Sequence, residues 1–333
     1  MVDFTVAIPT YNGASRIPPL LERLREQTNT ENFSWEIIVV DNNSTDNTKE
    51  VVENYQENWS NICTLKYAFQ PKQGLAFTRQ RAIQVASADK WIGFLDDDVI
   101  PAADWVEKAY AFAQTHPEVG AYGGQIHGAF EVDPPENFKR IQSFLAIRER
   151  GEKPHPYQPD LLSLPPGAAL VVDKEAWNEN KSLFGRDLKN NVMLAGEDYE
   201  ILLGMHRAGK EIWYNPTMHV HHQIPKKRLE KEYLIPLIRG CGSCVCYLHF
   251  VSAKTWEKPW IMTKIFLGSL RRAVKHRLKY GEQIKTNLIA ACEMEFFMSS
   301  ALSPFFLLKR TFQGYSEKIN LKPKTAGLEL KKN

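Results

Sequence analysis

Short apolar runs alternate with segments of helical periodicity along the first part of the chain. The runs have the length of buried strands, and between them apolar residues recur three or four positions apart, as on one face of a helix. Such alternation predicts a parallel sheet with right-handed crossover helices, which is an α/β fold. The predicted strands are residues 4–8, stopped by Pro9, then 36–40, 65–69 and 91–95, and the helices are 17–24, 51–59 and one opened by Gly74.

The pattern continues, less regularly, to about residue 225. Residues 127–163 mix proline, glutamate, arginine and aromatic residues without a clear period, which predicts long loops and one short helix around 141–148. Further apolar runs predict strands at 119–126, 170–172, 212–216 and 218–222, and helical spacing predicts helices at 104–115 and from 196 onward. The sheet is therefore expected to be Rossmann-like and mostly parallel.

Polar residues follow the predicted strands at their carboxyl ends, where open α/β sheets bind ligands. Asp96, Asp97 and Asp98 come directly after one strand, and Asp41 follows another. Carboxylates so spaced suit Mg²⁺ or Mn²⁺ with a phosphate-bearing substrate, although a solvated acidic turn or a helix cap gives the same pattern. The loop Pro9-Thr10-Tyr11 offers a ring that could stack on a base, or is an ordinary turn.

Three further features carry candidate chemistry, and each has a structural alternative. Arg79 could neutralise a diphosphate or could be a solvated helix charge. Glu197 and Asp198 occupy the first turn of a predicted helix, where carboxylates are also favoured by the helix dipole. Of the late histidines, His219 and His221 share one strand face and His222 takes the other, so at most two face one site.

Taken together, these motifs resemble family 2 inverting glycosyltransferases over roughly residues 1–225. The resemblance rests on Pro9-Thr10-Tyr11-Asn12, on the segment from Val39 to Asp46, on the helix with Arg79, on the Asp96–Asp98 triplet and on Gly196-Glu197-Asp198. It implies a GT-A fold and a nucleoside diphosphate sugar as donor. Many relatives carry a second Asp where this chain has Asn42.

The resemblance also implies roles for single residues. Thr10 and Asp41 would hold the base and ribose, with Pro9, Tyr11, Asn43 and Arg79 in the same donor site. Asp96 would contact the sugar and ribose, and Asp97 would belong to the donor site. Asp98 would ligate a metal together with Asp96, and His221 or His222 would touch the metal or the diphosphate. Asp198, or its neighbour Glu197, would be the general base.

Charge is distributed unevenly along the chain. The net charge is +3, but residues 226–333 hold 21 Lys and Arg against 8 Glu, or +13, which leaves −10 for residues 1–225. We therefore expect a catalytic domain at 1–225 and a basic, mainly helical extension at 226–333, with helices at 256–279 and 288–309 that are either interfacial or a cap. An anionic membrane surface is an expected partner of this extension, and nucleic acid is not. The last residues, rich in lysine, are predicted to be disordered.

The remaining composition bears on location and on rival functions. No apolar stretch of roughly 18 to 20 residues is evident, and five cysteines make no disulfide framework, which favours a cytoplasmic enzyme, peripheral at the inner face of the plasma membrane. Cys241, Cys244, Cys246 and His249 have spacings that a metal could use or that a packed helix could share. Segment 228–243 resembles one found in polysaccharide-assembling relatives.

The expected function is transfer of a sugar, from a UDP-linked donor, to a glycan or lipid-linked acceptor with Mn²⁺ or Mg²⁺ as cofactor. The alternative is a non-catalytic nucleotide-sugar-binding scaffold or sensor, which would need no general base. A nucleotide-sugar hydrolase would need the same metal site but no acceptor groove.

Overall fold

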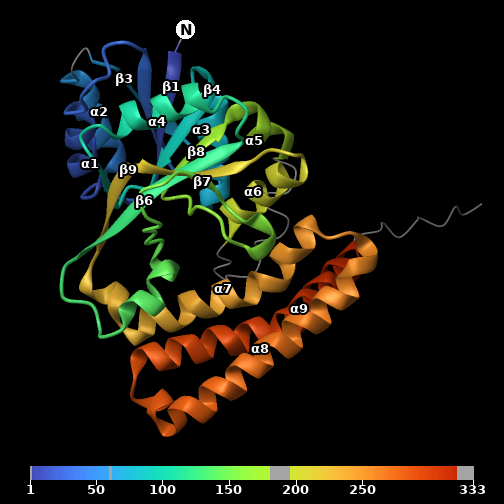
Figure 1. The fold of residues 1–333 in the computed structure, drawn as a ribbon. Coiled ribbons are helices and arrows are strands. Elements are labelled where there is room, and N and C mark those ends of the chain that lie inside the picture. Colours follow the sequence, from blue (N-terminus) through green and yellow to red (C-terminus); the bar gives the residue numbers. More distant parts are fainter. Residues whose placement is uncertain (1, 60–61, 181–195, 321–333) are drawn as a thin grey trace, which may run out of the picture.

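The computed structural model describes residues 2–59, 62–180 and 196–320 (Figure 1). The predicted disorder of the last residues lies outside these ranges. So do the side chains of Glu197 and of residues 310–320.

Four parallel strands form the first half of the sheet, as the apolar runs predict. They lie in the order β3 (Thr64–Phe69), β2 (Trp35–Asp41), β1 (Val2–Thr10) and β4 (Ala88–Leu95). The first strand continues through Pro9 instead of stopping there. Its pairing with β4 ends at Ala7 and Phe94, so no ladder bond to β4 needs the amide proton that Pro9 lacks.

The second half of the sheet is mixed. In the part of the chain that the structure describes, the order continues through β8, β6, β9 and β5, and β8 and β5 run antiparallel to their neighbours. The two strands predicted at 212–216 and 218–222 are one strand, β9, because a register shift against β6 absorbs the extra residues. Gly124 permits this shift, since a Cβ there would lie 2.2 Å from the carbonyl oxygen of Met218. The bounds are β5 (Val99–Pro101), β6 (Ala121–Phe130), β7 (His155–Pro156, paired with β9), β8 (Ala169–Asp173) and β9 (Ile212–Ile224).

Helices cover both faces of the sheet, because each predicted helix has one apolar stripe to bury. One core contains Ile17, Val52 and Trp105, and the other contains Ile83, Trp177 and Ile201. The first face carries α1 (Ile17–Arg25), α2 (Thr48–Glu57) and α4 (Trp105–Thr115), and the second carries α3 (Leu75–Val85), α5 (Lys174–Asn180) and α6 (Glu197–Arg207).

The short helix predicted at 141–148 is replaced by two 3₁₀ turns. These are η1 (Phe138–Arg140) and η2 (Gln142–Leu145), and η3 (Pro159–Leu161) follows later in the same region. Ala146 has a φ of 59°, a left-handed conformation that ends the turn before an α-helix can propagate.

The end of the chain forms a layer of long helices below the sheet (Figure 1). Cys244 and Leu248 of α7 join the core beneath α6, and Leu234 and Ile238 join Phe138 and Leu145 of the turns. α7 is apolar and long enough to cross a membrane by length and composition alone, although no such stretch was evident from the sequence; 44% of its most apolar window is buried in the protein. The elements are η5 (Lys226–Leu229), α7 (Lys231–Ser252), η6 (Thr255–Glu257), α8 (Lys258–Tyr280), η7 (Gly281–Lys285) and α9 (Leu288–Asn320).

Candidate active site

The three aspartates after β4 point to three different places. Asp96 contacts Arg79 of α3, Asp97 contacts the loop after β1, and Asp98 contacts the segment after β9. Because the chain turns sharply here, the amide of Val99 donates back to the carbonyl of Asp96. The triplet is therefore not one acidic patch but a junction of three separate polar contacts.

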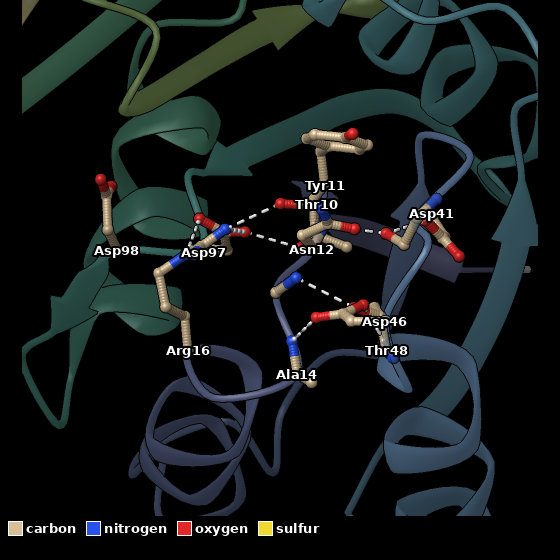
Figure 2. Close-up of polar contacts among 12 residues, drawn as sticks. Thr10, Tyr11, Asn12, Ala14, Arg16, Asp41, Asp46, Thr48, Asp97 and Asp98 are labelled. Atoms are coloured by element: carbon tan, nitrogen blue, oxygen red, sulfur yellow. Dashed lines mark hydrogen bonds and ion pairs between the residues drawn. The ribbon is translucent and has the colours of Figure 1, made fainter.

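Asp97 fastens the loop after β1 to the end of β4 (Figure 2). The hydroxyl of Thr10 donates to one oxygen of Asp97 at 2.5 Å, and Arg16 donates to both oxygens at 2.9 Å. Gly13 makes room for this group, since a Cβ there would lie 2.0 Å from Oγ1 of Thr10. Both oxygens of Asp97 are thus engaged by protein groups, while Asp98 points away from Arg16 in the same view.

The loops after β1 and β2 are tied together beside Asp41. The backbone amide of Asn12 donates to the hydroxyl of Ser44, and Ser44 in turn donates to Asp41 through both its amide and its hydroxyl. Tyr67 donates to the second oxygen of Asp41, and burial together with that contact raises the pKa of the Tyr67 phenol. The ring of Tyr11 projects from this pair of loops and is 46% exposed (Figure 2).

Asn42 and Asn43 stabilise the conformation of the same loop. The side chain of Asn42 donates to the carbonyl of Lys72 at 2.8 Å and accepts from the amide of Gly74 at 2.7 Å. It therefore holds the loop that opens α3, and an aspartate could not supply the donor. Asn43 has a φ of 60°, a left-handed conformation that asparagine tolerates better than most residues.

Arg79 joins two carboxylates that come from distant parts of the chain. Its guanidinium, 1% exposed, donates to Asp96 at 2.9 Å and to Oδ1 of Asp198 in the first turn of α6. Gly167 packs directly against this group, and a larger residue would not fit, since a Cβ there would lie 2.2 Å from Oδ2 of Asp198 and 2.5 Å from Arg79. The predicted donor residue and the predicted base thus share one buried cation.

The electrostatics of Asp96 differ from those of an ordinary surface aspartate. Burial raises the pKa of Asp96 to about 6, against the lowering effect of Arg79, and the charges of Asp98, Asp198 and Asp97 raise it as well. At neutral pH the carboxyl is ionised, but it takes up a proton under mildly acidic conditions.

Asp98 faces His222 and Arg228. Burial alone would raise the pKa of Asp98, but His222 and Arg228 lower it to about 2. Arg228 donates to Oδ2 of Asp98 at 2.7 Å and contacts Nε2 of His222 at 2.8 Å, and those two acceptor atoms are 3.4 Å apart. Nδ1 of His222 lies 2.9 Å from the carbonyl of Leu145, which orients the ring so that Nε2 faces Asp98 and Arg228.

This pair fits a divalent cation. A carboxylate oxygen and an imidazole nitrogen point at one position and already hold a positive group there, the guanidinium of Arg228. Among the described residues no group of three or more His, Cys, Asp or Glu side chains could hold a metal, and this includes the predicted cysteine and histidine set on α7. A metal at Asp98 would therefore need further ligands from a bound diphosphate or from water.

Of the two candidate histidines, His221 and His222, the one beside Asp98 is His222. Side chains alternate along β9, so His221 points to the opposite face, where its ring lies 5.3 Å from that of His127. Nε2 of His127 lies 2.9 Å from Nδ1 of His219, and Nδ1 of His127 lies 2.9 Å from Glu149. These three histidines form a separate cluster away from the aspartates.

Several residues of the site were not identified from the sequence. Arg16, which engages both oxygens of Asp97, has no strong local signal in the sequence. Arg228 lay in the weakly matching segment 228–243. The predicted Arg79 and Asp198 lie on α3 and α6 and contact each other. The other predicted residues at the carboxyl-end edge of the parallel strands or in the loops bordering it are Pro9, Thr10, Tyr11, Asp41, Asn43, Asp96, Asp97 and Asp98.

The sequence of this chain is similar to that of known glycosyltransferases and of a polysaccharide biosynthesis protein. The model of "Glycosyl transferase family 2" matches residues 5–171, half of the chain. The chain is 25% identical over 234 residues to the succinoglycan biosynthesis protein ExoM of Rhizobium meliloti, covering 69% of each protein. It is 31% identical over 156 residues to validoxylamine A glucosyltransferase of Streptomyces hygroscopicus, covering 45% of this chain but only 36% of that enzyme, about a third of its length.

Solved structures share the fold. Residues 1–349 of TarS from S. aureus, also solved with UDP and with UDP-GlcNAc, match with a TM-score of 0.51 at 17–18% identity, over 94% of this chain and 92% of that one. The mannosyltransferase PcManGT from Pyrobaculum calidifontis, in complex with GDP-Man and Mn²⁺, matches with a TM-score of 0.58 at 19% identity, over 91% and 86% of the two chains.

Proposed function

The chain belongs to glycosyl transferase family 2, and from this premise we propose that it transfers a sugar, with inversion, from a nucleoside diphosphate sugar to a glycan or lipid-linked acceptor. The observation that carries the proposal is the Asp96–Arg79–Asp198 group, which joins the end of a parallel strand to the start of α6. The UDP-bound forms of TarS support a UDP-linked donor, and ExoM supports a role in polysaccharide biosynthesis.

The donor is expected to lie along the loops after β1 and β2. Tyr11 has an exposed ring that could stack on a base, and Asp41 has a carboxylate fixed by Ser44 and Tyr67 near the ribose. Thr10 and Asp97 act together with Arg16 to hold the backbone of this site in one conformation.

Asp98 and His222 would hold a Mn²⁺ or Mg²⁺ ion, which when bound neutralises charge on the diphosphate leaving group. Asp96, at the same turn, would orient the sugar and ribose, and at neutral pH its carboxyl is ionised. Arg228 contacts the same two atoms of Asp98 and His222, so its guanidinium and a bound cation would compete for this position.

Asp198 would act as the general base. As the bond between the acceptor oxygen and the anomeric carbon forms, the bond from that carbon to the diphosphate oxygen breaks, and the acceptor's hydroxyl proton passes to Asp198. Arg79 engages Oδ1 and orients the carboxylate, while Oδ2 lies beside Gly167. Inversion follows because the base and the leaving group act from opposite sides of the sugar.

Nucleoside diphosphate release from UDP-, GDP- and TDP-sugars tests the proposal. We expect release from one class of donor, loss of release in EDTA, recovery with Mn²⁺ or Mg²⁺, and a higher rate when a glycan or lipid acceptor fraction is added. Donor binding without release would favour the scaffold or sensor. Release that no acceptor fraction increases would favour hydrolysis, and full activity in chelator would refute the metal site.

A further inference from the structure

The outer face of α8 carries an exposed apolar stripe. Trp260 is 70% exposed and Leu278, eighteen residues later and five full turns along the helix, is 81% exposed. The opposite face is buried, with His276 contacting the carbonyl of Ala290 on α9 at 2.9 Å. The stripe, which we call the α8 stripe, consists of Trp260, Leu267, Leu270, Val274 and Leu278.

The apolar surface extends beyond α8. Phe266 of α8 packs edge-to-face on Phe305 of α9, with ring centroids 5.6 Å apart, and Phe305 is itself exposed. Trp256, in the turn before α8, is 75% exposed. α9 lies between α7 and α8, so α8 is the outermost element of the helical layer (Figure 1).

Positive charge borders this surface. The 23 residues of α8 include seven Lys and Arg and no Asp or Glu. Lys264, Arg271 and Lys275 are exposed and, by the helical spacing, lie along one side of the α8 stripe. A helix with one apolar face, a basic border and tryptophan near one end is typical of helices that lie in a membrane interface.

The apolar and basic side chains of this surface favour one kind of binding partner over another. A second copy of the chain, docked through the same face, would bring Lys and Arg against Lys and Arg, which costs free energy. An anionic bilayer accepts the apolar side chains among its headgroups and acyl chains, and it also attracts each nearby Lys or Arg. We propose that the α8 stripe, with Trp256 and the exposed face of α9, docks on an anionic lipid surface with α8 parallel to the membrane plane.

Docking in this way would bring the catalytic side of the protein toward the membrane. β1 begins at the end of the sheet farthest from the helical layer, so the carboxyl ends of the parallel strands face that layer (Figure 1). The inference goes beyond the proposed transferase activity and does not depend on it, because it rests on the exposed residues of α8 and α9 alone.

Vesicle flotation of the full chain tests the docking. We expect the protein to float with vesicles that contain about 30% phosphatidylglycerol, to remain unbound with pure phosphatidylcholine, and to bind less as salt rises. The triple variant Trp260→Ala/Leu267→Ala/Leu278→Ala should lose roughly tenfold or more of the binding, because each side chain contributes buried apolar area. The variant Lys264→Ala/Arg271→Ala/Lys275→Ala should lose binding and most of its salt dependence.

Matched controls separate docking from general effects. Leu161→Ala changes an exposed leucine on η3, and Lys49→Ala changes an exposed lysine on α2, so both should bind like the parent. Equal binding to neutral and anionic vesicles, or full binding by the triple apolar variant, would refute the proposal. A dimer in vesicle-free solution that the triple variant abolishes would assign the stripe to a second copy instead.

Discussion

Asp198 and Asp96 share the guanidinium of Arg79, and this contact determines how each carboxylate can act. A base must be ionised before it takes a proton, and the carboxylate of Asp198 lies in the first turn of α6 with the guanidinium of Arg79 on its Oδ1. A capping role would need only an acceptor oxygen, which asparagine also provides.

Asp198→Asn separates these two roles. The variant should lower kcat by roughly 10² to 10⁴-fold, the range for loss of a general base, while donor affinity stays nearly unchanged. Steady-state kinetics and donor binding by calorimetry measure both. A folded variant that transfers sugar at the parental rate would exclude Asp198 as the base and point to Glu197 or another group.

Arg228 occupies the position that a cation would take between Asp98 and His222. Arg228→Ala removes a competing positive charge, so Mn²⁺ should bind the nucleotide-free protein roughly tenfold more tightly, as electron paramagnetic resonance of free Mn²⁺ would record. Lys227→Ala, an exposed neighbour in the same turn, should leave the affinity as it is. Unchanged or weaker Mn²⁺ binding by Arg228→Ala would show that the guanidinium does not compete.

For single residues, the sequence identified which residues belong to the site better than it predicted where their side chains point. The triplet Asp96–Asp98 was recognised as a candidate site, but a turn between strands sends its three side chains to three partners, and no local pattern predicts that. The alternation of side chains along a strand separated His221 from His222, yet only the neighbouring strand and Arg228 show which of them faces Asp98.

At the scale of elements, the long apolar runs predicted the parallel strands and the major helices. Elements that the sequence missed are short or held by distant contacts. β5 exists because Val99 pairs with His222, more than a hundred residues away. The α-helix predicted at 141–148 is not formed, because Ala146 has a left-handed backbone conformation that ends η2.

Glu36 shows how one element can contain a buried charge. It is 1% exposed at the start of β2, where it accepts hydrogen bonds from Thr5 of β1 and from the amide of Ser87 and forms an ion pair with Lys66 of β3. Burial would raise the pKa of Glu36, but Lys66, the Ser87 amide and Thr5 together lower it. The carboxylate therefore stabilises three neighbouring segments only while it is ionised.

The free energy of unfolding should consequently depend on pH through Glu36. Because the folded-state pKa is lowered, its stabilisation is present above the unfolded pKa and is lost as pH falls through the folded value. Glu36→Gln should reduce the free energy of unfolding by about 1–3 kcal/mol at neutral pH, and this free energy should then fall less steeply as the pH becomes acidic. Denaturant titrations of parent and variant between neutral and acidic pH measure this, and parallel pH profiles would contradict it.

For the whole molecule, the basic extension predicted at 226–333 combines two structural roles. α7 and α9 bury apolar residues against the sheet domain and against each other, whereas α8 leaves its apolar stripe exposed. The sequence left a cap and an interfacial layer as alternatives, because periodicity identifies an apolar face but not what covers it. In the structure, α7 and α9 pack as a cap, and the exposed face of α8 is the one for which we propose docking on lipid.

This packing predicts that the sheet and the helical layer unfold together. Leu248 of α7 is 6% exposed and lies in the same core as Ile201 and Trp177. Leu248→Ala should therefore reduce the free energy of unfolding by about 2–5 kcal/mol and shift one unfolding transition, shared by the sheet and the helices, to lower denaturant concentration. Leu278→Ala, on the exposed face of α8, should change the free energy of unfolding by less than about 0.5 kcal/mol. Chemical unfolding followed by helical circular dichroism and by loss of nucleotide binding should give coincident curves for the parent and for both variants. If Leu248→Ala shifted the helical signal alone, residues 226–333 would be an independent unit, and the boundary predicted near residue 225 would divide two folding domains.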